Sequence, residues 1–248
     1  MRKYKIAALI ISLFSILIIA ISLHHRKQGP YYYFYGDSIT AGEITDNNKE
    51  QRWPTIFCNL RHVTQDNFGR RGESLTGEDQ GGGIYSGFLS RYTDVIPQKE
   101  KSSDRLIFAY GTNDIGTFYY YGAAKATKIN TFKSAYRRVF SFCIQQGWKA
   151  EDILVISRYY FEDFSNQKVQ VPIDQKRADA FSDAVMDVCK EFGIQSCIDL
   201  KQAMIISGGT NILAPDKLHP NVKGHRVIAE ALNSWLSNKK YVNQKGGF

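Results

Sequence analysis

Short runs rich in β-branched and aromatic residues alternate with segments of helical periodicity along most of this 248-residue chain. Such alternation is the signature of parallel βαβ units. The runs are nearly continuous in apolar or aromatic residues, which suits strands that are covered on both faces. Five strands are predicted, at residues 31–35, 63–68, 106–110, 153–157 and 196–200. The pattern predicts an α/β domain built on a parallel sheet.

Helices are predicted where apolar residues recur at the 3.6-residue period. The clearest stripes are Phe132, Tyr136, Val139, Phe140 and Cys143; Phe181, Val185, Val188 and Phe192; and Val227, Ile228, Ala231, Leu232 and Trp235. Gly147 and Gly193 end the first two helices, where the next strand must begin. We see no internal repeat and no second domain, so we expect one domain over residues 28–238 and a flexible tail over 239–248.

An uncharged apolar run over residues 6–23 is long enough to cross most of a bilayer core. It predicts an uncleaved signal-anchor, a single transmembrane helix within residues 1–27. A cleaved signal peptide is the alternative, but its apolar core usually has about 7–15 residues and is not followed at once by basic residues. More positive charge precedes the run than follows it, which favours a cytoplasmic N-terminus and an extracytoplasmic domain.

The chain has 32 lysine and arginine residues, 24 acidic residues and a formal charge of +8. Five of the basic residues flank the apolar run, and residues 1–27 contain no acid. The remainder has no lysine or arginine block of the kind that would follow a phosphate backbone. We therefore expect no nucleic-acid partner.

Four cysteines, Cys58, Cys143, Cys189 and Cys197, allow three complete disulfide pairings. Export would permit disulfides, but the sequence does not choose among them. Cys58 and Cys143 lie among apolar residues of predicted helices, so small buried thiols are the alternative. No pair has the spacing of a zinc site, and we expect no metal.

Ligands bind beyond the carboxyl ends of the strands in an open parallel sheet, so the residues that follow each strand are the place to seek chemistry. Ser38 comes just after the first strand and a glycine that permits a tight turn. A serine so placed presents its hydroxyl at the sheet edge as a nucleophile, although Asp and Ser are also good helix N-caps.

Two further segments offer donors for a developing oxyanion. Gly72 follows the second strand and would let a backbone N–H approach without a side chain in the way. Asn113 follows the third strand and can aim a side-chain N–H at the same place. An ordinary turn and an Asx-turn are the structural alternatives.

Asp216 precedes His219 by three residues, near the start of the last predicted helix. Its carboxylate can accept the histidine Nδ1–H and leave Nε2 free as a base, although a capped helix start would explain the same pattern. The four segments follow different strands or precede the last helix, so we expect all of them at the same edge of the sheet. Together they indicate nucleophilic catalysis.

These segments resemble the four sequence blocks of the SGNH (GDSL-type) hydrolase superfamily, and the match spans residues 33 to about 236. They are Gly36-Asp37-Ser38, Gly72, Gly111-Thr112-Asn113-Asp114 and Asp216-Lys217-Leu218-His219-Pro220. The resemblance implies a flavodoxin-like fold, a three-layer α/β/α sandwich with a five-stranded parallel sheet. It also implies an esterase that needs no metal or organic cofactor.

Site residues are likewise implied by the resemblance. Ser38 would be the nucleophile, His219 the general base and acid, and Asp216 the carboxylate that orients it. The oxyanion donors would be the backbone N–H groups of Ser38 and Gly72 and the side chain of Asn113. Gly69 is the less favoured glycine of the second block, because the family usually shows Asn-x-Gly-x-x-Gly and uses the later one.

Several features depart from the family pattern or stay open. Residues 155–160 stand where many relatives have an apolar strand that ends in proline, so we expect an unusual wall there. Arg70 and Arg71 could meet an anionic substrate or be solvated. The aromatic residues 118–121 could stack on a sugar or pack a loop onto the domain. We assign no role to His62 and His225.

Our leading interpretation is a membrane-tethered, extracytoplasmic esterase that removes acetyl or other short acyl groups from a glycan. The exported topology, the aromatic loop and the absence of a long apolar segment near the site favour it. A lipid-directed esterase or lysophospholipase and an O-acyltransferase of the same fold are alternatives. A noncatalytic glycan-binding module is a fourth, and the intact catalytic positions argue against it. The oligomeric state stays open.

Overall fold

The structure is a computed structural model that describes residues 29–43, 48–77, 87–118, 127–163, 169–171 and 174–245. The transmembrane segment predicted within residues 1–27 lies outside these ranges, as do residues 119–121 of the aromatic cluster. A search of the described residues for a helix long and apolar enough to span a bilayer finds none.

Five parallel strands form the central sheet in the order β2-β1-β3-β5-β7. Their bounds are β1 Tyr31–Gly36, β2 Thr64–Asn67, β3 Arg105–Ala109, β5 Ile153–Arg158 and β7 Ser196–Asp199. Each lies within one residue of its predicted position, and every pairing is parallel. Counted without the two short strands β4 and β6, the order is that of flavodoxin-like folds. The predicted sheet is confirmed.

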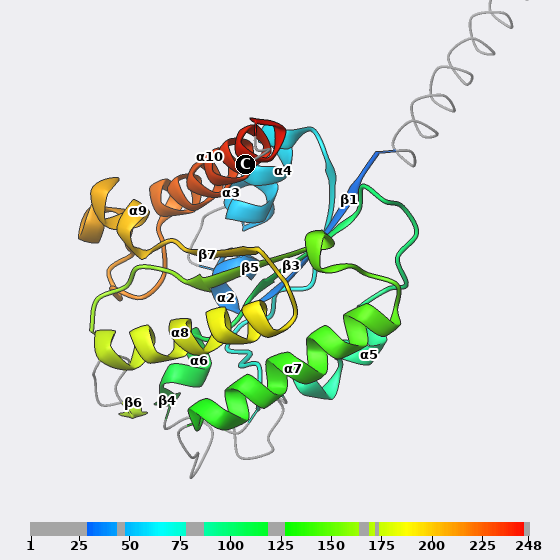
Figure 1. Cartoon of the computed structure of the whole chain (residues 1–248). Coiled ribbons are helices and arrows are strands. Elements are labelled where there is room, and N and C mark those ends of the chain that lie inside the picture. The colour runs from blue at the N-terminus through cyan, green and yellow to red at the C-terminus, as the bar shows by residue number, and fades with distance from the viewer. Residues whose placement is uncertain are drawn as a thin grey trace, which may run out of the picture.

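Helices cover both faces of this sheet (Figure 1). On one face lie α7 (Ile129–Gln145) and α8 (Gln175–Glu191), and on the other α4 (Trp53–Arg61) and α10 (Val222–Lys245). The remaining helices are short: α2 Ser38–Ala41, α3 Asn48–Gln51, α5 Tyr92–Val95, α6 Thr112–Ile115 and α9 Lys201–Ile206. The architecture is the expected three-layer α/β/α sandwich.

Two separate hydrophobic cores fill the spaces between the layers. Because successive side chains of a strand point to opposite faces, the central strands β1, β3 and β5 supply both cores. Tyr35, Phe108 and Val155 pack toward α7 and α8. Phe34, Ile107 and Leu154, their chain neighbours, pack toward α4 and α10. This double burial explains why the strands read as nearly continuous apolar runs.

Two segments differ from the prediction. Strand β4 (Thr117–Phe118) pairs antiparallel with β6 (Val169–Val171), and neither is among the five predicted strands. Strands this short depend on a distant partner, which a local pattern does not show. Helix α10 also continues past the predicted domain boundary at residue 238, to Lys245, and the flexibility of the tail stays a prediction. After Gly224 in its first turn, α10 contains no further glycine or proline up to Lys245.

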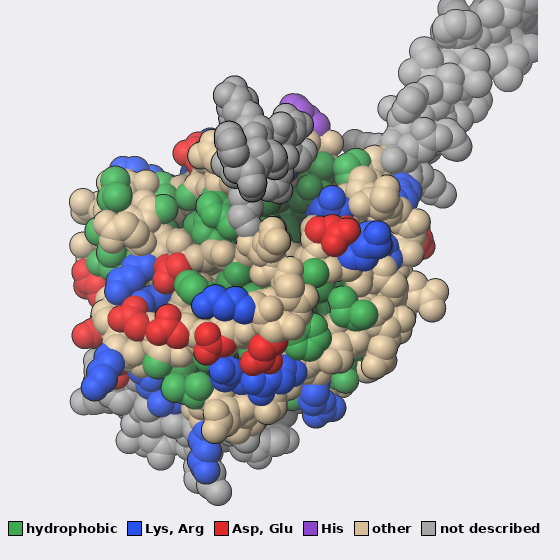
Figure 2. Space-filling view, viewed as in Figure 1, with side chains coloured by type: hydrophobic (Ala, Val, Ile, Leu, Met, Phe, Trp, Pro, Cys, Tyr) green, Lys and Arg blue, Asp and Glu red, His purple; other side chains and the backbone are tan. Residues whose placement is uncertain are grey.

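Charged side chains on the face seen in Figure 2 are interspersed, with acidic and basic groups side by side. Ion pairs link α7 to α8 on the surface, with 3.1 Å between Lys133 Nζ and Asp187 Oδ2 and 2.7 Å between Arg137 Nε and Glu191 Oε2. These pairs are exposed, so each contributes little to stability.

All four cysteines are thiols in the structure, and Cys58, Cys143 and Cys189 are buried. Burial raises the pKa of the Cys58 thiol to about 12 and raises that of Cys143 as well. A thiol with so high a pKa is a poor nucleophile, so we interpret these two as packing residues.

Candidate active site

Ser38 lies where β1 ends and α2 begins. A Cβ atom on Gly36 would come within 2.9 Å of the Ala109 carbonyl oxygen, so only glycine lets the chain turn so close to β3. The preceding residue, Asp37, caps α2, because its Oδ1 accepts the Ile39 N–H at 2.9 Å. The N-cap of α2 is therefore Asp37 and not Ser38, which leaves the Ser38 hydroxyl for another partner.

The Ser38 hydroxyl is hydrogen-bonded to a histidine 181 positions away in the sequence. Its Oγ lies 2.8 Å from His219 Nε2, and His219 Nδ1 lies 2.7 Å from Asp216 Oδ2. The other oxygen of Asp216 accepts the backbone N–H groups of Leu218 and His219, both at 3.0 Å. An Nδ1–H held by the carboxylate leaves Nε2 as the acceptor for the serine proton.

The loop that carries Asp216 and His219 is a tight turn closed by its own backbone. Leu213 and Pro220 form an antiparallel bridge, and the Ala214 N–H donates to the His219 carbonyl oxygen at 2.8 Å. Lys217 adopts a left-handed conformation, with φ of 62°. Helix α10 begins after this loop, and the Asn221 side chain accepts the Gly224 N–H there. The Asp216 carboxylate is therefore not the cap of α10.

The two aspartates of the site have pKa values shifted in opposite directions. Burial raises the pKa of Asp37 to about 6, although the Ile39 N–H and the nearby His219 act to lower it. For Asp216, burial also acts to raise the pKa, but hydrogen bonds from the His219 ring and backbone outweigh it and hold the pKa below its usual value. Asp216 is therefore the carboxylate that stays ionised beside the histidine.

Strand β2 pairs with β1, and the segment that contains Gly72 follows directly after β2. The Arg70 N–H donates to the Gly36 carbonyl oxygen at 2.9 Å, which keeps the chain next to the Ser38 turn. Gly72 follows with φ of 66°, a left-handed conformation that favours glycine. The Gly69 N–H already donates to Asn67 Oδ1 at 2.8 Å. The engaged N–H of Gly69 argues against Gly69 as the second-block glycine.

Asn113 lies in α6, directly after β3, and is 7% exposed. Its Nδ2 donates to the Glu73 carbonyl oxygen at 3.1 Å. Because Glu73 follows Gly72, this bond joins the two predicted donors. The next residue, Asp114, accepts the Leu75 N–H at 2.8 Å and the Thr76 N–H at 3.1 Å. Helix α6 therefore anchors the segment after Gly72 at successive positions.

Sequence reasoning missed the buried residues that hold this segment. Arg91 and Tyr110 both bind the carboxylate of Glu73, and Asp114 holds the backbone after it. An acidic residue inside a glycine-rich stretch was the available signal for Glu73. Its partners come from distant parts of the chain, so no local pattern points to them.

The other singled-out polar residues have partners outside the Ser38–His219–Asp216 series. His225 is fully buried, accepts the Trp53 N–H on Nδ1 at 3.3 Å, and has its pKa lowered by burial to about 4. His62 ends α4 in a left-handed conformation. Arg71 is 80% exposed in its side chain and pairs with Glu43 at 2.7 Å, which fits the solvated interpretation. Arg158, in the unusual wall, is buried and pairs with Asp179 of α8.

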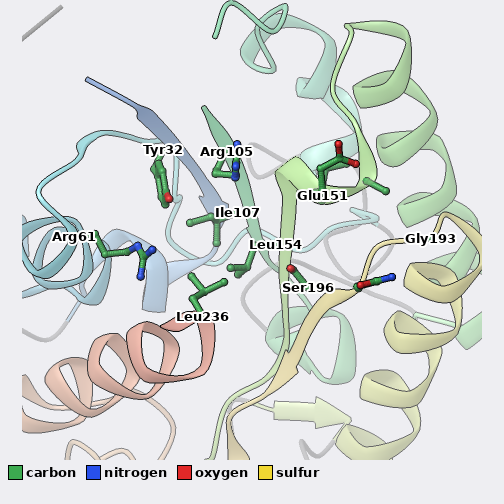
Figure 3. A pocket seen from close by; sticks show the side chains of 12 residues that line it. Tyr32, Arg61, Arg105, Ile107, Glu151, Leu154, Gly193, Ser196 and Leu236 are labelled. Atoms are coloured by element: carbon green, nitrogen blue, oxygen red, sulfur yellow. The ribbon is translucent and has the colours of Figure 1, made fainter. Parts of the chain in front are cut away.

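A cavity of about 410 Å³ lies at the opposite, amino-terminal edge of the sheet (Figure 3). It is lined by residues from the starts of strands, such as Tyr32 and Ser196, together with Arg61 and Leu236. None of the predicted catalytic residues lines it. Within the described ranges, no group of His, Cys, Asp and Glu side chains could hold a metal ion.

Known proteins resemble this chain in sequence or in fold. Residues 34–227 match the model of the GDSL-like lipase/acylhydrolase family. The curated proteins contain no match to the sequence. A solved lipase/acylhydrolase from Enterococcus faecalis is similar, with a TM-score of 0.63 and 17% identity over 85% of this chain and 96% of that one.

Two carbohydrate-active enzymes are also similar in structure. A variant of an acetyl-xylooligosaccharide esterase from Geobacillus has a TM-score of 0.58 and 16% identity, over 82% of this chain and 92% of that one. A family two carbohydrate esterase from Clostridium thermocellum, in complex with cellohexaose, has a TM-score of 0.57 and 18% identity, over 85% of this chain and 64% of that one. At these identities the likeness shows the fold alone.

Proposed function

The chain belongs to the GDSL-like lipase/acylhydrolase family of ester hydrolases, and on this premise we propose that it removes short acyl groups, above all O-acetyl, from a carbohydrate. The observation that carries the proposal is the hydrogen-bonded series Ser38–His219–Asp216, built from the two ends of the domain. Exported topology and membrane tethering belong to the same proposal and rest on the apolar run near the N-terminus.

The proposed reaction proceeds by two acyl transfers. Ser38 Oγ attacks the ester carbonyl carbon while His219 Nε2 takes the hydroxyl proton. The tetrahedral intermediate collapses, the bond to the alcohol oxygen breaks, and His219 returns the proton to the departing alcohol. Water then attacks the acyl-enzyme with His219 again as base, which releases the acid and restores Ser38. Asp216 fixes the histidine tautomer and stabilises the imidazolium in both steps.

The proposed reaction also requires that the negative charge that develops on the carbonyl oxygen be stabilised. The backbone N–H groups of Ser38 and Gly72 and the Nδ2–H of Asn113 are the proposed donors. Asn113 Nδ2 carries two hydrogens, and one is donated to Glu73, so the second can be given to an oxyanion. Donors held before the substrate arrives need no reorganisation during the reaction.

A shallow groove of about 530 Å³ supports a carbohydrate as the alcohol part of the substrate. It adjoins the catalytic loop, because Glu162 in its lining donates its backbone N–H to the Lys217 carbonyl oxygen at 3.0 Å. Tyr160, Asp163 and Lys201 also line it. Aromatic rings beside charged and polar groups suit a sugar better than an acyl chain. The two structural neighbours with carbohydrate substrates point in the same direction.

A lipid ester is the second candidate. Ile206 of α9 is 76% exposed, next to Ile205, which lines the same groove. A membrane anchor would hold such apolar residues near a lipid surface.

The test is hydrolysis of aryl esters of increasing acyl length by the full chain, with Ser38→Ala and the exposed Ser207→Ala as paired variants. We expect the acetyl ester to be hydrolysed fastest. Ser38→Ala should abolish this hydrolysis, and Ser207→Ala should leave it unchanged. Acetylated glycans would then be screened for released acetate. A preference for long acyl chains would favour the lipid ester, and acyl groups found on an added acceptor glycan would favour an acyltransferase. Absence of Ser38-dependent turnover would overturn the esterase proposal.

A further inference from the structure

We propose that Glu73, Arg91 and Tyr110 form a buried positioning unit that holds the oxyanion donors Gly72 and Asn113 in place without touching the substrate. The inference rests on the proposed function and deepens it. Turnover then depends on the buried ion pair of Glu73 and Arg91, which does not contact the substrate.

The three side chains form a closed hydrogen-bonded cluster. Arg91 Nε lies 2.7 Å from Glu73 Oε1, and its Nη2 lies 2.5 Å from Oε2. The Tyr110 hydroxyl donates to Oε2 at 2.6 Å. Glu73, Arg91 and Tyr110 are 3%, 7% and 2% exposed. A bidentate arginine pair fixes both the position and the plane of a carboxylate, so Glu73 has little freedom to move.

The cluster also holds the backbone of the turn that contains Gly72. Arg91 Nη2 donates to the Phe68 carbonyl oxygen at 2.8 Å, before Gly72 in the chain. Glu73 follows Gly72, and its carbonyl oxygen accepts Asn113 Nδ2 at 3.1 Å. The backbone of the turn is therefore held by hydrogen bonds on both sides of Gly72. Any shift of Glu73 would move the Gly72 peptide and the Asn113 amide together.

Tyr110 connects the cluster to the element that carries Asn113. It is the last residue before Gly111 and α6, and its carbonyl oxygen accepts the Tyr136 hydroxyl from α7 at 3.2 Å. Its ring stacks on Phe88, with 4.9 Å between ring centroids. The ring is thus fixed by packing, and its hydroxyl links the Gly72 turn to the end of β3.

The protonation states suit this arrangement. Burial opposes the charge on Arg91, but the hydrogen bond to Glu73 outweighs it and raises the pKa of Arg91 above its usual value. Burial, together with the Glu73 charge, holds the pKa of Tyr110 well above its usual range, so its hydroxyl remains a donor.

A buried ion pair is not explained by stability alone, since well-packed apolar residues of similar size are often as stable or more so. Oxyanion stabilisation, in contrast, depends on donors that are already in place. We therefore expect the cluster to act on the transition state and not on substrate binding.

The experiment compares Glu73→Gln and Tyr110→Phe with the control Arg137→Gln. The first variant keeps the shape of the side chain but removes its charge, and the second removes one hydroxyl and keeps the stacked ring. The control breaks an exposed ion pair between α7 and α8, away from the site. For each variant, kcat and KM for an acetyl aryl ester and the affinity for an arylboronic acid would be measured in the full chain.

We expect kcat to fall roughly 10- to 100-fold in both cluster variants, less than for deletion of a donor. KM should change less than about threefold, and boronate affinity should fall in parallel with kcat, because the tetrahedral adduct uses the same donors. The control should match the wild type.

Three outcomes would overturn the inference. The wild type could be active while Tyr110→Phe and Glu73→Gln keep its kcat and lose only thermal stability. That result would show that the cluster is merely structural. A rise in KM with unchanged kcat would place the cluster in substrate binding. A wild type without Ser38-dependent turnover would overturn the proposed function, and this inference with it.

Discussion

The two segments that meet at Ser38 are held in different ways. The loop of Asp216 and His219 is fixed by its own backbone hydrogen bonds, and these two proposed catalytic side chains are 32% and 17% exposed. The turn of Gly72 and Glu73 is fixed by buried side chains from other elements, Arg91, Tyr110 and Asn113.

This difference matches the two tasks that we propose for the segments. A general base must exchange protons with the substrate and with water, so it needs access to solvent. Oxyanion donors must stay in place while charge develops, and they act most strongly where water is excluded. Substitutions in the exposed loop should therefore reduce turnover with little effect on stability, whereas substitutions around the buried turn should reduce both.

The largest effect is expected in the exposed loop, for Asp216→Asn. Asparagine can still accept the backbone N–H groups of Leu218 and His219, so the free energy of unfolding should hardly change. It does not hold the Nδ1–H tautomer of His219, and kcat should fall about 10,000-fold. Ester hydrolysis and urea denaturation would be measured beside the exposed control Asp183→Asn. A loss of less than about tenfold would contradict the role of Asp216 in orienting the histidine.

In the buried turn, Asn113→Ala should be less damaging to turnover but worse for stability. Loss of one oxyanion donor should lower kcat about 100- to 1,000-fold. The Glu73 carbonyl oxygen would also lose its buried donor, which should lower the free energy of unfolding by about 1–2 kcal/mol. Asn59→Ala, on the exposed face of α4, is the control. If Asn113→Ala lost activity without any loss of stability, the contrast between the two segments would fail.

A pH-dependent effect is expected at Asp37. Its pKa is raised to about 6 in the folded chain, above the usual value of an unfolded aspartate near 4, so its buried charge lowers stability as pH rises from about 4 to 6. Asp37→Asn removes that charge and keeps an acceptor for the Ile39 N–H. The variant should gain about 2–3 kcal/mol of unfolding free energy at pH 8 and almost nothing at pH 3. Urea denaturation across this range checks it, and a gain that is independent of pH would contradict it.

The smallest effect is expected for Lys217→Gly in the exposed loop. Lys217 has a left-handed backbone, which costs a non-glycine residue about 1 kcal/mol, partly offset by the greater freedom of glycine when unfolded. Stability should rise by up to about 1 kcal/mol, with kcat unchanged. Lys223→Gly, in the helical backbone of α10, should instead lower stability. Thermal unfolding of both variants tests the sign, and a loss in Lys217→Gly would show that the lysine side chain stabilises the loop.

Much of the fold could be predicted because its signals are local. The central strands β1, β3 and β5 are short, largely apolar or aromatic runs that end near a turn, and α7 and α8 carry clear apolar stripes. The pair β4 and β6 was not predicted, since each strand is short and its partner is some fifty positions away. Helix α10 runs past the predicted boundary at residue 238, because that boundary was based on the nearness of the chain terminus and not on a helix-ending residue.

The amino-acid sequence by itself determined the positions of the five strands of the main sheet, the family, and the segments in which Ser38, Gly72, Asn113, Asp216 and His219 occur. These follow from periodicity and short motifs, which each segment carries alone. Only the tertiary structure decided the hydrogen bond from Ser38 to His219, the opposite pKa shifts of the two aspartates, and the cluster behind Gly72. Burial and contact between distant residues produce these features, and neither is visible until the chain is folded.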